Sequence, residues 1–481
     1  MFDNIVSLAK RRGFFYPSSE IYGGLANTWD FGHYGTLLKN NFRDMWWQYF
    51  VLRREDMVGI EASTFLNPKA WEASGHVAGF TDMLIDCKNC KLRMRADHLI
   101  EDYLSNTPEK ELEIDSYQVI DEKKFIHIKE SKKVEGLNES EMDALINGLH
   151  ISCPNKKCGS FQWTPVRKFN LLFGTEIGIV EDNKSRVYLR GEIAQGIFLN
   201  FKNILDTMRV KIPFGIAQQG KAFRNEITMG QSIFRTLEFD LMEFEYFIRQ
   251  EEWEKQFNYW KDELWNFSQL IGIDKTKLRW RDHEEAERAH YSKGTVDLEY
   301  KFPFGFKEMW AVAYRTNFDL SNHTKHSGED LSYRDPKTNE KFIPHVIEPT
   351  FGMSRGVLVL LVDAYREEEV HGKMRTYLKL DPKMAPVKAA VFPLQKDEKL
   401  RGKARELYES LRGSFVTEFD DAGNIGKMYR RQDEIGTPYC ITVDYQTLED
   451  QTVTIRERDT MSQQRMAIDD VLPFIQDKLK W

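Results

Sequence analysis

The sequence predicts an α+β protein, with an antiparallel sheet flanked by helices and a smaller α/β domain at the C-terminal end. Two strand-like runs, 214–226 and 234–248, follow each other across a short loop, as neighbouring antiparallel strands do. Apolar residues recur at helical spacing over 36–52, which predicts an amphipathic helix whose aromatic face packs in a core or a dimer contact. From Pro386 onward strand and helix patterns alternate, which is typical of a small α/β domain with a mixed sheet.

Length, charge and hydropathy limit the functional class. The 481 residues allow about two to four domains. No apolar run reaches the roughly 18 residues of a membrane-spanning helix, and the N-terminal basic cluster follows the apolar residues, unlike a secretory signal. We therefore expect a cytoplasmic protein with no membrane partner. The net charge of −7 argues against a surface that attracts phosphate backbones throughout, but it allows a local basic patch.

Two glutamates interrupt the second strand-like run. Alternate residues share one face of a strand, so Glu243 and Glu245 point the same way. Charged groups are costly on a buried face unless they are paired. Two interpretations stay open: this is a solvated outer face of the sheet, or it is the floor of a pocket that binds a cation.

Four of the five cysteines form two pairs on either side of a polar stretch. Residues 101–150 are rich in Glu, Lys, Asp and Ser, and the pairs Cys87/Cys90 and Cys153/Cys158 flank them. The pattern predicts a zinc-ribbon-like insertion, because four thiolates at these spacings suit a tetrahedral Zn²⁺ site. Free thiols, or a site that has lost its metal, are the alternatives. Cys440, in an apolar run, is expected in a core.

The ends of the two strand-like runs that face each other across the short loop carry residues suited to a nucleotide. The forks of Arg224 and Arg235 match phosphate oxygens, Phe239 can stack on a purine, and Glu226 can accept from an exocyclic amine. Antiparallel strands would bring these groups to one end of a sheet. An Arg-x-Glu pattern alone is common, so a surface ion pair is the alternative.

Four segments, in order along the chain, resemble the class II aminoacyl-tRNA synthetases, and the glycyl family in particular. Residues 221–247 (KAFRNEITMGQSIFRTLEFDLMEFEYF) are similar to motif 2, and residues 348–355 (EPTFGMSR) are similar to motif 3. Residues 15–30 (FYPSSEIYGGLANTWD) resemble the opening of the glycyl family. Residues 420–444 resemble the anticodon-binding domain shared with the histidyl, prolyl and threonyl enzymes.

The resemblance implies an enzyme that activates glycine with ATP and Mg²⁺ and loads it onto tRNA(Gly), working as a cytoplasmic homodimer. It also implies a domain order. The catalytic core would comprise 1–85 with motif 1 and 166–383 with motifs 2 and 3. The insertion would occupy 86–165, and the anticodon-binding domain would occupy 384–481.

The resemblance assigns roles at the nucleotide. Arg224 and Arg355 would be the catalytic arginines, with Arg224 at the α-phosphate and Arg355 at the outer phosphates, and Glu308 would contact Mg²⁺. The complete ATP-binding set would be Arg224, Asn225, Glu226, Phe234, Arg235, Phe239, Glu308, Met309, Gly352 and Arg355.

The resemblance also implies a glycine site made of carboxylates. Three glutamates would surround the ammonium group, with a hydroxyl beside them and two arginines at the pocket edge. These residues are Glu192, Glu243, Glu348, Thr350, Arg95 and Arg315. Glycine offers no side chain to grip, so such a pocket must select by excluding a larger residue's Cβ while fixing the ammonium.

Two rival functions and three departures from the family pattern bear on this assignment. A non-catalytic synthetase-like binding protein would typically lack Arg224 or Arg355, and both are present. A class II synthetase for another amino acid would not need the three-glutamate set. In the first departure, Gly32-His33-Tyr34-Gly35 stands where motif 1 usually has a Gly-Pro-x-Gly turn, which alters the expected local geometry of the dimer interface but not the dimer itself. Gly191 replaces the usual proline before the first pocket glutamate and is expected to loosen that loop, whereas Thr350 replaces a serine and keeps the hydroxyl.

The sequence also predicts the structure of three further segments. Residues 253–290 are predicted to be helical, and the histidines in 321–328 are placed in a polar loop without a catalytic role. Lys427, Arg430 and Arg431 form a basic helix face, which is either solvated or in contact with tRNA phosphates.

Overall fold

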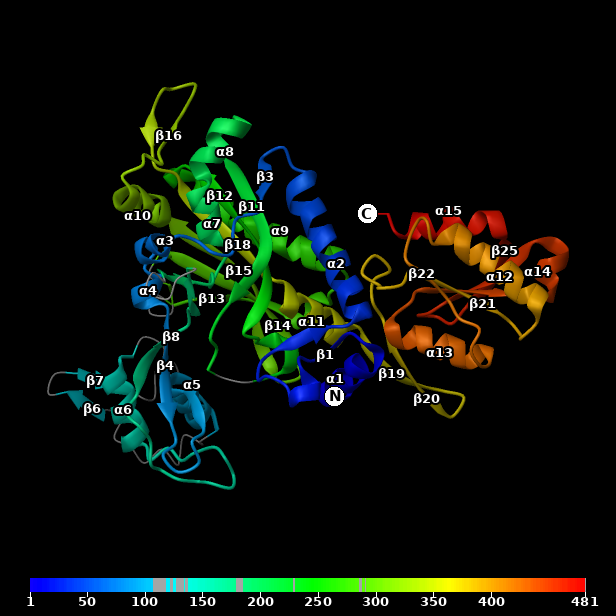
Figure 1. Cartoon of the computed structure of the whole chain (residues 1–481), viewed down its shortest axis with the longest axis horizontal. Coiled ribbons are helices and arrows are strands. Elements are labelled where there is room, and N and C mark those ends of the chain that lie inside the picture. Colours follow the sequence, from blue (N-terminus) through cyan, green and yellow to red (C-terminus); the bar gives the residue numbers. More distant parts are fainter. Residues whose placement is uncertain are drawn as a thin grey trace.

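The computed structural model describes residues 1–106, 118–121, 124–126, 134, 137–178, 185–227, 230–284, 288–289 and 291–480. They form three regions (Figure 1): a central sheet with its helices, a smaller region around β4, β8 and α5, and a C-terminal domain on the other side of the molecule. Much of the polar stretch between the cysteine pairs lies outside the described residues.

A seven-stranded sheet forms the centre, in the order β13-β14-β15-β18-β12-β11-β3. Every neighbouring pair is antiparallel except β11 and β3, which are parallel. This confirms the predicted antiparallel sheet. Its strands are β3 (Met57–Ile60), β11 (Phe214–Phe223), β12 (Glu238–Ile248), β13 (Leu278–Asp282), β14 (Gly294–Phe302), β15 (Gly305–Thr316) and β18 (His345–Gly352).

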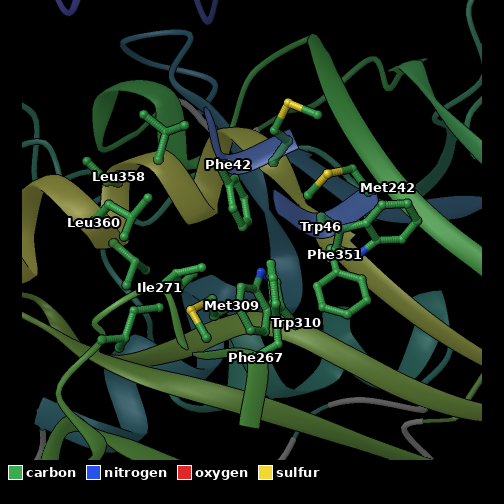
Figure 2. Close-up of a cluster of buried hydrophobic side chains, with 14 of the residues drawn as sticks. Phe42, Trp46, Met242, Phe267, Ile271, Met309, Trp310, Phe351, Leu358 and Leu360 are labelled. Atoms are coloured by element: carbon green, nitrogen blue, oxygen red, sulfur yellow. The ribbon is translucent and has the colours of Figure 1, made fainter. Parts of the chain in front are cut away.

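Three helices bury one face of this sheet. They are α2 (His33–Trp47), α9 (Trp253–Leu270) and α11 (Met353–Ala364). Figure 2 shows Phe42 and Trp46 of α2 packed against Trp310 and Phe351 of the sheet, all without solvent exposure. The aromatic side of the first predicted helix is therefore core. The opposite face of the sheet, called the polar face because it carries Glu243 and Glu348, also holds an apolar cluster around Phe214 and Phe247.

Two expected elements were wrong. The helix predicted over 253–290 ends at Leu270, because Gly272 takes a positive φ of 86° and residues 278–282 then pair with β14. The polar loop expected at 321–328 is mostly helix α10 (Phe318–Ser327), which buries Leu320 and His323 on its inner side. The polar residues of this helix occupy buried, half-buried and exposed positions alike, so its composition shows no apolar helical period.

The insertion has a core of its own. Strands β4 (Thr81–Asp86), β5 (Arg93–Arg95) and β8 (Arg167–Asn170) form a sheet in the order β5-β4-β8. Helices α5 (Ala96–Asn106) and α6 (Glu139–Gly148) pack on an apolar cluster that contains Ile85, Ile100 and Trp163.

The C-terminal domain has the expected mixed sheet, in the order β22-β21-β23-β24-β25. Its first three strands are parallel and its last two are antiparallel additions, which the sequence did not predict. Helix α13 packs against one face, where Cys440 is buried as expected, and α12 and α15 pack against the other. The elements are β21 (Ala389–Pro393), α12 (Glu398–Leu411), β22 (Thr417–Phe419), α13 (Ile425–Ile435), β23 (Tyr439–Val443), α14 (Tyr445–Asp450), β24 (Thr452–Glu457), β25 (Gln463–Ala467) and α15 (Ile468–Lys478).

Short elements complete the chain. None of the helices that the structure describes combines the length and the apolarity needed to cross a lipid bilayer. The remaining elements are α1 (Phe2–Arg12), β1 (Phe15–Pro17), β2 (Trp29–Phe31), α3 (Pro68–Ala73), α4 (His76–Gly79), β6 (Gln118–Asp121), β7 (Lys124–Ile126), β9 (Gly174–Ile177), β10 (Ser185–Tyr188), α7 (Ala194–Leu199), α8 (Phe201–Met208), β16 (Tyr333–Arg334), β17 (Lys341–Phe342), β19 (Tyr365–Val370) and β20 (Lys373–Leu378).

The hairpin β19–β20 leaves the end of α11 and docks on the C-terminal domain through a buried ion cluster. Arg375 Nε donates to Asp433 Oδ2 at 2.8 Å, and Arg456 donates to both oxygens of Asp433 at 2.9 and 3.1 Å. All three side chains are at most 6% exposed. This cluster is one of the contacts that place the C-terminal domain, together with the ion pair Arg12–Glu434 and the hydrogen bond from Tyr34 to Glu418.

We predict that Asp433→Asn lowers the free energy of unfolding by about 3–5 kcal/mol, because it leaves the buried Arg456 without its carboxylate and Arg375 with only the more exposed Glu368. Urea unfolding, followed by circular dichroism, measures the change. The control is Asp206→Asn, which breaks the solvent-exposed pair with Lys202 and should have little effect. Equal effects of the two substitutions would contradict the role given to the cluster.

Candidate active site

A cavity of about 360 Å³ lies on the polar face of the central sheet. Most of the residues that the sequence analysis assigned to ATP and glycine line it. From the ATP set these are Arg224, Glu226, Phe234, Arg235, Phe239, Glu308, Gly352 and Arg355, and from the glycine set they are Glu192, Glu243, Glu348 and Thr350.

Strand periodicity explains why these residues meet. On β12, Phe239, Leu241 and Glu243 line the cavity, whereas Met242 and Phe244 between and beyond them pack in the core. The register between β12 and β18 puts Thr350 opposite Glu243. The face of Glu243 is thus buried, and the solvated interpretation was wrong.

One end of the cavity is rich in arginine. Arg224, just after β11, donates from Nε to the carbonyl of Gly191 at 3.0 Å, and its guanidinium lies over the ring of Phe239, 5.4 Å from the centroid. Arg355, in the first turn of α11, pairs with Glu308 at 2.8 Å. Arg235 lies 3.9 Å from Glu226. These cations and the aromatic ring suit a polyphosphate attached to a base.

The other end of the cavity is rich in carboxylates around one buried cation. Arg315 is 0% exposed. Its Nε and Nη2 donate to Asp319 at 2.8 and 2.9 Å, and its Nη1 donates to Glu348 at 2.8 Å. Glu192 lies 3.6 Å from the same guanidinium, and the ring of Tyr291 stacks on it at 3.7 Å.

Burial affects the three cavity glutamates differently. It raises the pKa of Glu348 to about 7, although Arg315 opposes the shift. It raises the pKa of Glu243 well above its usual range, and Glu348 and Glu192 add to the effect. Burial would raise the pKa of Glu192 as well, but His76 and Arg315 outweigh this effect and hold the pKa below its usual range. The surroundings of Glu243 and Glu348 therefore favour the protonated forms of these acids, an effect that a cation in the pocket would oppose.

Four of the assigned residues are not among the described residues that line the cavity. Arg95 was expected at the edge of the glycine site. It lies on β5 of the insertion, where Asp82 and Asp97 hold its guanidinium and where its charge acts on Glu226 and Arg235 of the cavity. Arg315 lies beneath the pocket rather than at its edge. Met309 points into the core, and Asn225 donates its backbone N–H to Leu171.

The structure also adds residues that the sequence analysis missed. His76 lies 3.3 Å from Glu192 with its other ring nitrogen at Ser74 Oγ, and it is 3% exposed. Asp297, on β14, lines the cavity beside His283 at 2.7 Å. A lone histidine and an aspartate in a strand carry no spacing signal, so only the fold could reveal them.

Two further expectations concern nearby loops. The loop before Glu192 is not loosened by Gly191, because Arg190 anchors it to the carbonyls of Lys221 and Ala62 at 2.6 and 2.9 Å. A Cβ at Gly191 would meet Phe80 at 2.9 Å, so the glycine permits close packing. His323 is buried with its Nε2 2.8 Å from Gln195, which is a structural role.

The four paired cysteines converge in the insertion. All four sulfur atoms lie within 4.8 Å of one another, with Cys87–Cys158 at 3.7 Å and Cys90–Cys153 at 3.6 Å. A tetrahedral site with Zn–S bonds of about 2.3 Å has sulfur–sulfur edges of about 3.8 Å. The geometry fits a four-thiolate zinc site.

Comparison with known proteins places the chain in a family. Residues 82–171 match the glycyl-tRNA synthetase insertion domain 1, and residues 388–478 match an anticodon-binding domain. The glycine–tRNA ligases of Alkaliphilus oremlandii and of Caldanaerobacter subterraneus subsp. tengcongensis are each 50% identical to this chain, over 100% of its length and 98% of theirs. That of Clostridium acetobutylicum is 50% identical over 99% of this chain and 98% of its own. With the cavity that joins arginines to a carboxylate cluster, these likenesses show that the chain belongs to the glycyl-tRNA synthetases.

Proposed function

We propose that this cavity activates glycine with ATP and that the same site passes the glycyl group to tRNA(Gly). A carboxylate oxygen of glycine attacks the α-phosphorus of ATP and pyrophosphate leaves. A ribose hydroxyl of the tRNA then attacks the glycyl carbonyl and AMP leaves. The observation that carries the proposal is a single cavity with arginines at one end and three buried glutamates at the other.

The arginine end supplies what phosphoryl chemistry needs from a protein, which is positioning and stabilisation of charge. Arg224 lies between the two ends, beside Phe239, and would hold the α-phosphate against the glycine carboxylate. Arg235 and Arg355 would hold the outer phosphates and exchange their present contacts with Glu226 and Glu308 for phosphate oxygens.

Two carboxylates suit the magnesium that accompanies ATP. Glu308 and Asp297 both line the cavity, and Mg²⁺ prefers oxygen ligands and phosphates. When bound, such an ion neutralises charge on the phosphates. The protein's own part is to present these oxygens from neighbouring strands β14 and β15.

The glutamate end suits the ammonium of glycine. Glu243 and Glu348 lie on adjacent strands, and Glu192 faces them from the loop before α7. An ammonium has three donors, which matches three carboxylates, and the hydroxyl of Thr350 lies alongside. Side chains crowd this end, so a residue with a Cβ would be excluded.

We predict that Arg224→Ala lowers glycine-dependent ATP–pyrophosphate exchange by about 10²–10³-fold, because it removes a cation from the developing charge at the α-phosphate. Arg334→Ala, which changes an exposed arginine outside the cavity, is the control.

The same assay separates this function from its rivals. Exchange with glycine, and with none of the other standard amino acids, supports the proposal. A protein without exchange activity would be a non-catalytic relative. Exchange that Arg224→Ala leaves intact would contradict the role of this arginine.

We also propose that Cys87, Cys90, Cys153 and Cys158 hold one Zn²⁺ that closes the base of the insertion without taking part in chemistry. The sulfur–sulfur distances support it. The four cysteines belong to the region of the sheet β5-β4-β8, whereas the cavity lies on the central sheet.

Elemental analysis should find about one zinc per chain, and Cys90→Ser should lower both the zinc content and the thermal midpoint of the insertion. Cys440→Ala is the matched control, since this cysteine is buried in the C-terminal domain and should leave the zinc in place. Only traces of metal, in protein produced with zinc supplied, would refute the site.

The C-terminal domain is proposed to meet tRNA through α13. Lys427 and Arg430 are exposed on this helix, whereas Arg431 is tied to Asp420 at 2.7 Å. The basic face therefore consists of two solvent-facing cations, which phosphate oxygens attract. The alternative is that they are merely solvated.

Reversing both charges, Lys427→Glu with Arg430→Glu, should lower the kcat/KM for tRNA charging about tenfold or more and spare ATP–pyrophosphate exchange. Lys399→Glu, on α12 across the sheet, should affect neither reaction. Normal charging by the double variant would show that this face is only solvated.

A homodimer and a cytoplasmic location complete the proposal. Both rest on family resemblance. The exposed apolar residues Ile21, Tyr22 and Leu25, in the segment that resembles the family's opening, are consistent with a surface that a second copy covers.

A further inference from the structure

A fourth glutamate, Glu245, lies directly behind the proposed glycine site. It follows Glu243 by two residues on β12, so both side chains project from the same face of the strand. The register that pairs Glu243 with Thr350 and Tyr246 with Ile347 puts Glu245 opposite Glu348. Glu245 is 0% exposed and is not among the described residues that line the cavity. A ligand in the cavity would therefore contact Glu243 and Glu348 but not Glu245.

Glu245 lies close to both of these carboxylates and has no partner of its own. One oxygen each from Glu243, Glu245 and Glu348 lies within 4.8 Å of the others. Among the described residues neither oxygen of Glu245 has a hydrogen-bond partner, and Oε1 of Glu243 also lacks one. Acceptors thus face one another across a short gap with no donor between them.

The nearby cation is already engaged. Arg315 donates through Nε and Nη2 to Asp319 and through Nη1 to Glu348. The charged groups that act on Glu245 are Glu348, Arg315, Glu243 and Asp319, so three of the four are acids. An ionised Glu245 would add a further negative charge to a buried cluster whose guanidinium, Arg315, is already engaged.

A protonated Glu245 would supply the missing hydrogen-bond donor and would avoid the additional buried negative charge. Burial raises the pKa of Glu245 well above its usual range, and Glu348 adds to the shift. An acid with a raised pKa keeps its proton as the pH passes its ordinary value, so the folded protein favours the neutral form of Glu245. A protonated carboxyl group carries one O–H donor, which an ionised one lacks.

We propose that Glu245 is a positioning residue that stays protonated through the reaction and donates its O–H to the carboxylate pair of Glu243 and Glu348. The inference rests on the proposed function of the pocket. The hydrogen bond fixes the two carboxylates in the orientation that receives the ammonium of glycine. It also limits the negative charge of the site, which must be balanced by a ligand with a single positive charge.

Two substitutions of Glu245 test whether its role depends on its O–H donor, on a negative charge or only on the volume of its side chain. Glu245→Met keeps the approximate volume but removes the donor, and it should raise the KM for glycine by about 10- to 100-fold. The KM for ATP and kcat should change little, because Glu245 touches neither the nucleotide nor the reacting atoms. Glu245→Gln supplies an uncharged N–H donor of nearly the same shape and should restore the KM for glycine to within about threefold of the parent protein.

A pH profile adds a readout that a packing defect would not move. The dependence of the glycine KM on pH, from about pH 6 to about pH 9, should be the same in Glu245→Gln as in the parent protein, because the parent residue does not titrate there. Calorimetry in two buffers with different ionisation enthalpies should find that both proteins release the same number of protons when glycine binds. Glu243→Gln is the matched contrast, since it should change both quantities.

Three outcomes would overturn the proposal. Normal glycine binding by Glu245→Met would show that no donor is needed. A loss in Glu245→Gln as large as in Glu245→Met would show that the charge matters. A shifted pH profile in Glu245→Gln would show that Glu245 titrates. If Glu245→Met fails to fold, the profile and proton count of Glu245→Gln still decide. Absence of glycine-dependent exchange in the parent protein would instead refute the function of the pocket itself.

Discussion

The buried guanidinium of Arg315 is the interaction on which the catalytic region depends. It joins Asp319 of α10, Glu348 of β18 and Glu192 of the loop before α7, with its own strand β15 between them. Each of these carboxylates would be costly to bury without a cation. The elements that enclose the glutamate end of the cavity therefore pack around this positive charge, and His76 is a second partner for Glu192.

The carboxylates gathered around Arg315 form one chemical end of the cavity, and the arginines form the other. The insertion and the C-terminal domain are held by separate interactions. The arginines lie beyond the carboxylates, where phosphates can reach them, and strand alternation keeps both sets away from the aromatic core. Arg355 opens α11, and the same stretch of chain continues through β19 and β20 to Asp433. One continuous segment thus leads from the arginine end of the cavity to the ion cluster at the C-terminal domain.

Much of this was determined locally by the sequence. The period of two in 234–248 predicted a strand with Glu243 and Glu245 on one face, and the helical period in 36–52 predicted the aromatic face of α2 that packs in the core. The cysteine spacings predicted the cluster of four sulfur atoms. Family resemblance then named most of the cavity residues. These features depend on near neighbours in the chain, which the sequence displays directly.

Only the tertiary structure decided which polar groups are buried and what they meet. The sequence left the face of Glu243 and Glu245 either solvated or enclosed, because burial depends on β18, β15 and α10, which are distant in the chain. It placed Arg95 with glycine, whereas β5 carries this residue into the insertion. It gave no sign of His76 beside Glu192, or of Asp433 between Arg375 and Arg456. The sequence determines periodicity and chemistry, but the pairing of charges across distant elements, and hence their protonation, exists only in the folded chain.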